Sequence, residues 1–120
     1  MPDRAQDFLP LRPVDFLVLL MLAPKERHGY GIMQDVFDHT DGHLELEAGS
    51  LYRTIRRLGD QGLLEETGRR PAAEADDERR RYYRLTSFGR KVVTAEATRL
   101  RSLVRLAESA RVLEPSRSRA

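Results

Sequence analysis

The sequence contains no cysteine and no tryptophan, and these absences exclude several kinds of chemistry at once. Without cysteine the chain has no disulfide, no thiolate metal site and no cysteine nucleophile. Lysine is also scarce, so nearly all of the positive charge is carried by arginine. Arginine suits contacts to phosphate and guanine, although the same bias can reflect the base composition of a genome.

A long apolar run is lacking as well. The run from Val14 to Ala23 is too short to span a membrane. Asp3, Asp7 and Asp15 precede or enter it, and Pro24-Lys25-Glu26 follows where a signal peptide would have small residues. We therefore expect a buried helix here, no membrane association, and a cytoplasmic location.

The length of 120 residues allows one domain with a modest core. Hydrophobic residues make up 40% of the chain and charged residues 33%, which is the profile of a small soluble protein. The net charge is only +2, so the positive charge is concentrated in particular segments. Such a distribution is compatible with a small DNA-binding protein.

The most informative stretch runs from Ala48 to Glu66. Leu51, Ile55 and Leu58 recur at helical spacing and form one stripe of a helix expected from about Ala48 to Gln61. The other side carries Tyr52, Arg53 and Arg56, with Arg57 at its edge and Ser50 in the first turn. A short helix of this kind can lie in the major groove of DNA, where arginine binds phosphates or guanine. A solvated surface helix has the same charge pattern, so the context must decide.

Two helices are expected before this one. The first runs from Pro13 to about Ala23 and is apolar nearly all round, which predicts a central buried helix. The second begins at His28-Gly29-Tyr30-Gly31 and ends near Thr40. Tyr30 is placed either to touch a phosphate or to pack on a neighbouring helix.

Three short strands are expected. Alternation from His43 to Glu47 predicts the first. Leu63 to Thr67 and Arg81 to Leu85 predict a hairpin, here called the wing, with Tyr83 and Leu85 facing the core.

The segment between the wing strands is polar and basic. Arg79 and Arg80 are expected to contact DNA. The acidic run from Glu74 to Glu78 would repel phosphate, so it is expected to turn away or to pair with arginines.

A long helix closes the chain, with Thr86 as its N-cap and an end near Leu113. Five apolar residues recur at the spacing of a coiled-coil seam: Val93, Ala97, Leu100, Val104 and Ala107. So small a domain cannot cover the whole helix, which predicts packing against a second copy. Residues 1–10 are expected to form a flexible arm, and residues 114–120 a disordered tail.

These elements predict a mainly α fold with a small β-hairpin: a winged helix-turn-helix over residues 11–85 and a dimerisation helix over residues 86–113. In its motifs the sequence resembles the PadR family of bacterial transcriptional regulators, and the single closing helix resembles the shorter subfamily. The matching residues are His28-Gly29-Tyr30-Gly31-Ile32, Gly49-Ser50-Leu51-Tyr52-Arg53 with Leu58 and Gly62-Leu63, and Arg81-Tyr82-Tyr83-Arg84-Leu85-Thr86 leading to Gly89. The sequence departs from the pattern at Gly59, which costs about 1 kcal/mol relative to alanine in a helix.

The resemblance implies a homodimeric repressor that binds a palindromic double-stranded DNA operator and needs no cofactor. Tyr52, Arg53 and Arg56 would reach bases or nearby phosphates, Ser50 and Arg57 would fix the register on the backbone, Tyr30 would touch phosphate, and Arg79 and Arg80 would supply wing contacts. Some relatives release DNA when a phenolic or hydrophobic drug binds, and others have no known ligand. Phe8, Phe16 and Leu100 are the residues expected to line such an effector pocket, between the long helix and the first helix of the other subunit.

The two other classes of function are an enzyme and a protein-binding module. His39 and His43, near Asp38 and Asp41, could suggest a metal site, but a helix end and a turn separate them, which favours a solvated loop. No serine–histidine arrangement or phosphate loop stands out, so we do not expect an enzyme. A winged-helix module that binds protein without specific DNA binding stays open as the alternative, although such modules usually lack a basic recognition face.

Overall fold

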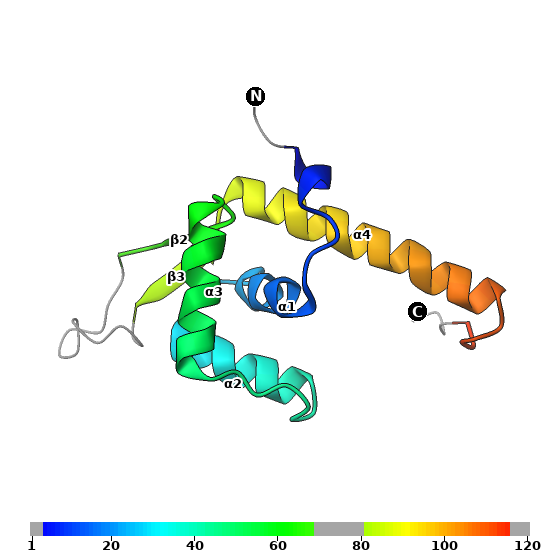
Figure 1. Cartoon of the computed structure of the whole chain (residues 1–120), viewed down its shortest axis with the longest axis horizontal. Coiled ribbons are helices and arrows are strands. Elements are labelled where there is room, and N and C mark those ends of the chain that lie inside the picture. The colour runs from blue at the N-terminus through cyan, green and yellow to red at the C-terminus, as the bar shows by residue number, and fades with distance from the viewer. Residues whose placement is uncertain (1–3, 69–80, 116–120) are drawn as a thin grey trace.

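The computed structural model describes residues 4–68 and 81–115, and its helices and small sheet are shown in Figure 1. The elements follow in the order η1 (Ala5–Phe8, a 3-10 helix), α1 (Pro13–Leu22), β1 (Arg27–His28), α2 (Gly29–His39), α3 (Ala48–Asp60), β2 (Leu64–Glu66), β3 (Tyr82–Leu85) and α4 (Ser87–Ser109). This confirms the predicted fold class: a mainly helical winged helix-turn-helix with a long closing helix.

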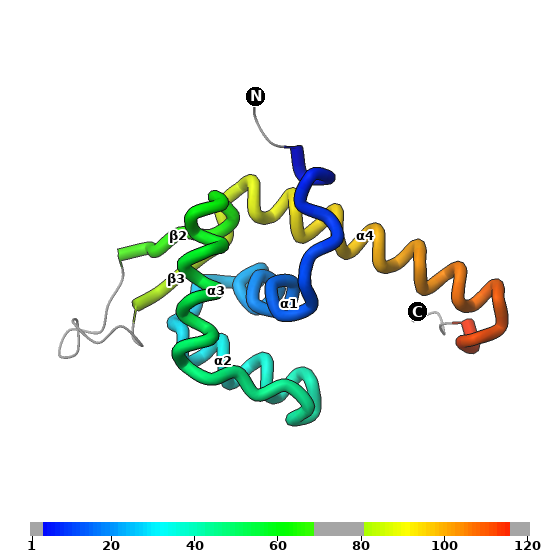
Figure 2. Tube along the Cα trace, in the orientation of Figure 1, coloured from blue at the N-terminus to red at the C-terminus, as the bar shows by residue number. Residues whose placement is uncertain are grey.

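Helix α1 lies at the centre of the domain. Figure 2 shows it surrounded by α2, α3 and α4. Pro13 occupies the first helical position, where its missing N–H costs nothing, and Val18, Leu19 and Leu22 are buried. The apolar character of nearly every side of this helix is explained by this position, as predicted.

The sheet is antiparallel, with the strand order β1–β3–β2. Strands β2 and β3 form the predicted wing, with Leu64 opposite Leu85 and Glu66 opposite Tyr83. Tyr83 is buried and Leu85 packs against the core, so the inward face of β3 is the predicted one. The remaining strand, β1, pairs with the other edge of β3, with Arg27 opposite Tyr83.

The strand predicted from His43 to Glu47 is wrong. This segment is an irregular connection in which Leu46 is buried, Leu44 is partly buried and Glu47 is the N-cap residue of α3. An alternating segment becomes a strand only when a neighbouring strand supplies backbone partners. In the described ranges both edges of β3 are already occupied, by β1 and β2.

The end of α4 also differs from the prediction. The helix stops at Ser109 rather than near Leu113, because Arg111 adopts a left-handed φ of 64°. The N–H of Val112 then donates to the carbonyl of Ala107 at 2.9 Å, a bond that closes the helix end. Glycine usually takes the left-handed position, so the arginine gave no signal of the stop.

The described part of the predicted arm is a docked segment rather than a free one. Phe8 in η1 meets Phe88 of α4 edge-on, with ring centroids 5.4 Å apart. The N–H of Leu11 donates to the carboxylate of Glu96 at 3.1 Å. Glu96 is buried and also accepts two hydrogen bonds from Arg99, at 2.6 and 2.9 Å. These bonds, from Arg99 above all, hold the pKa of Glu96 below its ordinary value.

Helix α4 extends well beyond the other helices, as Figure 1 shows. In its first half Val92 and Val93 are buried in the core of their own chain. Val93, which was predicted to lie in a seam between two copies, therefore packs inside the domain. Further along, Leu103 and Val104 are 48% and 42% exposed. Within the described ranges, no helix is long and apolar enough to cross a membrane.

Candidate nucleic-acid interface

Helix α3 divides into a buried and an exposed face. Leu51, Ile55 and Leu58 are buried, which confirms the predicted apolar stripe, and Thr54 is buried beside them. The exposed face carries Gly49, Arg53, Arg56 and Asp60, with Ser50 partly exposed in the first turn. The basic residues of α3 therefore lie on the surface, as a DNA-reading helix requires.

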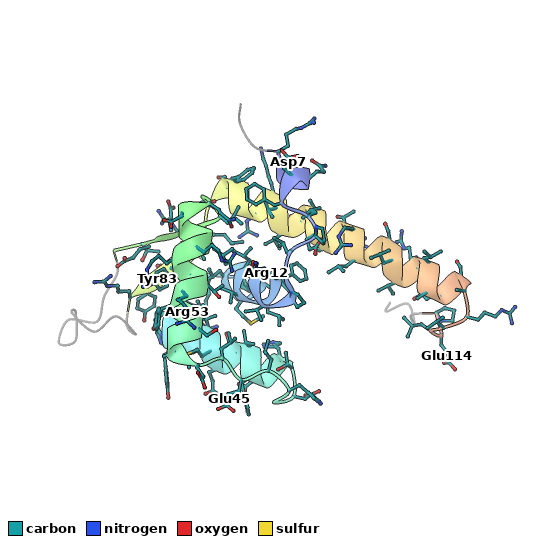
Figure 3. All side chains as sticks on the ribbon, viewed as in Figure 1. Asp7, Arg12, Glu45, Arg53, Tyr83 and Glu114 are labelled. Carbon is teal, nitrogen blue, oxygen red and sulfur yellow. The ribbon has the colours of Figure 1, made fainter. Side chains whose placement is uncertain are left out.

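A groove of about 490 Å³ follows this exposed face. Figure 3 labels two of its arginines, Arg53 on α3 and Arg12 at the start of α1. The groove is lined by Arg12, Ser50, Arg53, Thr54, Arg56, Arg57 and Asp60. Its walls therefore come from two helices that are distant in the sequence.

Tyr52 does not lie on the exposed face where the sequence analysis placed it. Its side chain is 9% exposed and its hydroxyl is buried. The ring packs on Gly29 at the start of α2, where an added Cβ would lie only 2.8 Å from ring carbon Cε1. Tyr52 and Gly29 thus form one packing unit between α2 and α3, and the tyrosine cannot reach DNA in this conformation.

Arg57 was predicted to contact the DNA backbone, but it binds a carboxylate of its own chain. Its guanidinium donates two hydrogen bonds to the buried carboxylate of Asp15 in α1, at 3.1 and 2.8 Å. Hydrogen bonding to Asp15 raises the pKa of Arg57. The pair ties α3 to α1, so Arg57 holds α3 in place and two of its donors are engaged by the protein.

Tyr30 is exposed, at 58%, and projects from the first turn of α2. His28 is the N-cap of that helix, and its Nδ1 accepts a hydrogen bond from the N–H of Gly31 at 2.9 Å. The motif around Tyr30 is therefore explained locally: His28 caps the helix, and Gly29 makes room for Tyr52.

On the wing, the described arginines lie close to acidic side chains. Arg84 is paired with Glu65 at 2.8 Å, and Arg81 lies 3.8 Å from Glu66. Arg79, Arg80 and the acidic run from Glu74 to Glu78 lie outside the described residues. Across the part that is described, the wing presents more balanced charge than α3 does.

The chain matches a known protein family over the region that includes this surface. Residues 18–95 match the Transcriptional regulator PadR-like family. The chain belongs to the PadR-like family. The matched region includes α3, the wing strands and the first part of α4, and membership makes the protein a DNA-binding regulator.

Individual proteins resemble this chain in sequence or in fold. An uncharacterized protein from Lysinibacillus sphaericus is 29% identical over 77 residues, which is 64% of this chain and 68% of that one. A PadR family transcriptional regulator from Eggerthella lenta is 26% identical, with a TM-score of 0.63 over 93% of this chain and 87% of that chain. A PadR-like transcriptional regulator from Bacillus cereus shares the fold, with 17% identity and a TM-score of 0.67 over 86% and 93% of the two chains.

PadR-like proteins are transcriptional regulators, which are generally not enzymes. His39 Nδ1 lies 2.8 Å from the carbonyl of Asp35, and His43 Nδ1 lies 2.9 Å from that of Thr40. Among the described residues, no group of three histidine or acidic side chains could hold a metal ion.

The residues predicted for an effector pocket do not line the cavity that the described residues form beside η1 and the start of α4. Phe8, Phe16 and Leu100 are each partly buried. A cavity of about 580 Å³ beside η1 and the start of α4 has a different lining, which includes Gln6, Arg90 and Thr94. The predicted pocket lies between two subunits, so it stays a prediction.

Arg12 is a residue of this surface that was not predicted from the sequence. It is the N-cap residue of α1, is exposed, and faces the same groove as Arg53 and Arg56. No pattern of neighbouring residues indicates its position, because which end of α1 lies beside α3 depends on how the helices pack.

Proposed function

We propose that this PadR-like protein is a homodimeric repressor that binds a palindromic DNA operator through the exposed face of α3. The observation that carries the proposal is the pair Arg53 and Arg56, both exposed and neither engaged by a partner within the described residues. Guanidinium groups held on the surface of a short helix suit guanine O6 and N7 or backbone phosphates in the major groove.

In this proposal Arg53 and Arg56 read bases or nearby phosphates, and Ser50 contacts the backbone from the first turn of α3. The exposed Tyr30 adds a phosphate contact from α2, and Arg79 and Arg80 add contacts from the wing. Tyr52 and Arg57 contribute indirectly, because they hold α3 against α2 and α1.

Dimerisation is proposed to occur through the second half of α4. Ala97, Leu100, Val104 and Ala107 continue the stripe that begins with the buried Val93. Within this chain Ala97, Leu100 and Ala107 are only partly buried, and Val104 is exposed. Leu103 widens this apolar surface. To bind a palindromic operator in two successive major grooves, a two-fold axis through paired α4 helices would have to hold the two α3 helices about 34 Å apart.

Release of the operator by a small hydrophobic or phenolic effector is the final part of the proposal. The partly buried Phe8, Phe16 and Leu100 would supply apolar lining once a second subunit closes the site. A rise in the melting temperature of the protein with such compounds, together with loss of operator binding, is the expected result.

The decisive experiment is fluorescence anisotropy with DNA from just upstream of the protein's own gene, against a scrambled duplex, at two salt concentrations. Tighter binding to the native DNA that weakens with salt is expected from a sequence-specific regulator. Equal, weak binding to both duplexes at either salt concentration would contradict specific recognition of this operator. A stable protein partner in the absence of DNA binding would favour an interaction module.

A further inference from the structure

The arginines of the α3 groove fall into two classes. Arg57 is bound to Asp15 by two hydrogen bonds. Arg12, Arg53 and Arg56 make no side-chain hydrogen bond or ion pair with any described residue. Three unengaged guanidinium groups from two helices therefore share one groove, whose single lining carboxylate belongs to Asp60, the last residue of α3.

The backbone at Arg12 is held on both sides. The N–H of Leu11 donates to Glu96 at 3.1 Å, and the carbonyl of Arg12 accepts from the N–H of Phe16 at 3.0 Å. Pro13 restricts the chain immediately afterwards. The point from which the Arg12 side chain leaves the backbone is therefore fixed by α4 on one side and α1 on the other.

Glu96 has no direct access to the groove, since it is 2% exposed and engaged by Arg99 and Leu11. The hydrogen bond from the N–H of Leu11 links Glu96 to the backbone next to Arg12. A contact of this kind links the long helix to the face that carries α3.

We propose that Arg12 is a phosphate-binding residue of the DNA interface and that Glu96 of α4 positions it. The inference rests on the proposed DNA binding by α3. While α3 occupies the major groove, Arg12 would bind the sugar-phosphate backbone at the edge of that groove. Contacts to phosphate position a protein without reading sequence, so Arg12 would strengthen binding to any duplex.

The first test replaces Arg12 with alanine and measures affinity for the native and scrambled duplexes over a range of salt concentrations. Loss of one phosphate contact should weaken binding to both by about 5–10-fold near 0.1 M salt and reduce the salt slope by about 0.9. The matched control is Arg105→Ala, which removes the same charge from an exposed position on the extending half of α4. Identical affinities and slopes for the two variants would overturn the role of Arg12.

A third variant, Arg53→Ala, separates this inference from the proposed function. If the unmodified protein does not prefer the native duplex, the proposed function fails. If it does prefer that duplex and Arg53→Ala weakens binding while Arg12→Ala matches Arg105→Ala, only the present inference fails.

The positioning role of Glu96 is tested with a conservative and a disruptive change. Glu96→Gln keeps an oxygen that accepts from the N–H of Leu11, whereas Glu96→Ala removes it. We expect Glu96→Ala to reduce the salt slope as Arg12→Ala does, and Glu96→Gln to restore it. In an Arg12→Ala background, Glu96→Ala should have no further effect on DNA affinity. An equal loss in both backgrounds, among variants that melt well above the assay temperature, would overturn the positioning role.

Discussion

At the scale of single residues, Arg53 and Arg57 show how one turn of a helix separates two kinds of chemistry. Both are arginines of α3, four positions apart. Arg53 is exposed, whereas Arg57 donates two hydrogen bonds to Asp15 of α1, which is 42 positions away in the chain. The first is available to a ligand, and the second stabilises the position of the helix that carries the first.

The same substitution is therefore expected to change stability at position 57 and DNA binding at position 53. Arg57→Ala should lower the free energy of unfolding by about 1–3 kcal/mol, because it leaves the buried carboxylate of Asp15 without its partner. Arg53→Ala should change stability by less than about 0.5 kcal/mol but weaken specific DNA binding by about 1–3 kcal/mol. Denaturant unfolding and anisotropy titrations measure the two quantities, and a fully stable Arg57→Ala protein would refute the assigned role.

Tyr52 and Gly29 illustrate a second relation between residues. The ring of Tyr52 occupies the space that a side chain at position 29 would need. The glycine and the tyrosine stand in two different motifs of the sequence, yet one packing contact explains both. Because Tyr52 is next to arginines on its helix, the sequence predicted that it lies on the surface. Its contact with Gly29 of the neighbouring helix instead buries it in the core.

At the scale of elements, two glycines show what helix packing demands. An added Cβ at Gly59 in α3 would lie 3.7 Å from Leu64 Cδ1, which is ordinary contact. An added Cβ at Gly89 in the first turn of α4 would lie 1.9 Å from the carbonyl oxygen of Leu63, which is a backbone atom. Helix α4 therefore begins against the chain that leaves α3, and only glycine allows this approach.

Alanine at these two positions should accordingly shift stability in opposite directions. Gly59→Ala should stabilise the protein by about 0.5–1 kcal/mol, since alanine is the better helix former and finds room. Gly89→Ala should destabilise it by about 2–3 kcal/mol, because the backbone of Leu63 must move. Thermal or denaturant unfolding of both variants provides the comparison, and stabilisation by Gly89→Ala would contradict the close contact.

At the scale of the whole molecule, α4 serves the fold and leaves a surface uncovered. Thr86 caps it by accepting from the N–H of Gly89 at 2.9 Å, and its first turns cover the core with Val92 and Val93. The same stripe continues into the exposed Leu103 and Val104 beyond the domain. An apolar stripe that continues beyond the core of its own domain suggests that a second copy of the chain packs against it.

A charge placed on this stripe should therefore weaken association of the two copies. Val104→Glu should raise the dimer dissociation constant by at least about tenfold, because an unpaired carboxylate would be buried in the interface. Ser102→Glu adds the same charge at an exposed position on the other side of the helix and should leave association unchanged. Analytical ultracentrifugation over a concentration series measures both, and an unaltered Val104→Glu dimer would place the interface elsewhere.

The sequence by itself determined the fold class, the family and the limits of most helices. A continuous apolar run predicted α1, and apolar spacing predicted α3 with its buried stripe. Pro13, Gly62 and Thr86 marked helix ends, because these signals act within a few residues along the chain. The helix end at the left-handed Arg111 was not predicted, because arginine rarely adopts that conformation.

Only the tertiary structure decided which polar residues face outward. It buried Tyr52 against Gly29, committed Arg57 to Asp15, and paired β3 with Arg27–His28 instead of the alternating segment after α2. It also brought Arg12 to the groove of α3 and joined Leu11 to Glu96. Each of these results depends on a partner many residues away, and helical spacing carries no information about how two distant elements pack.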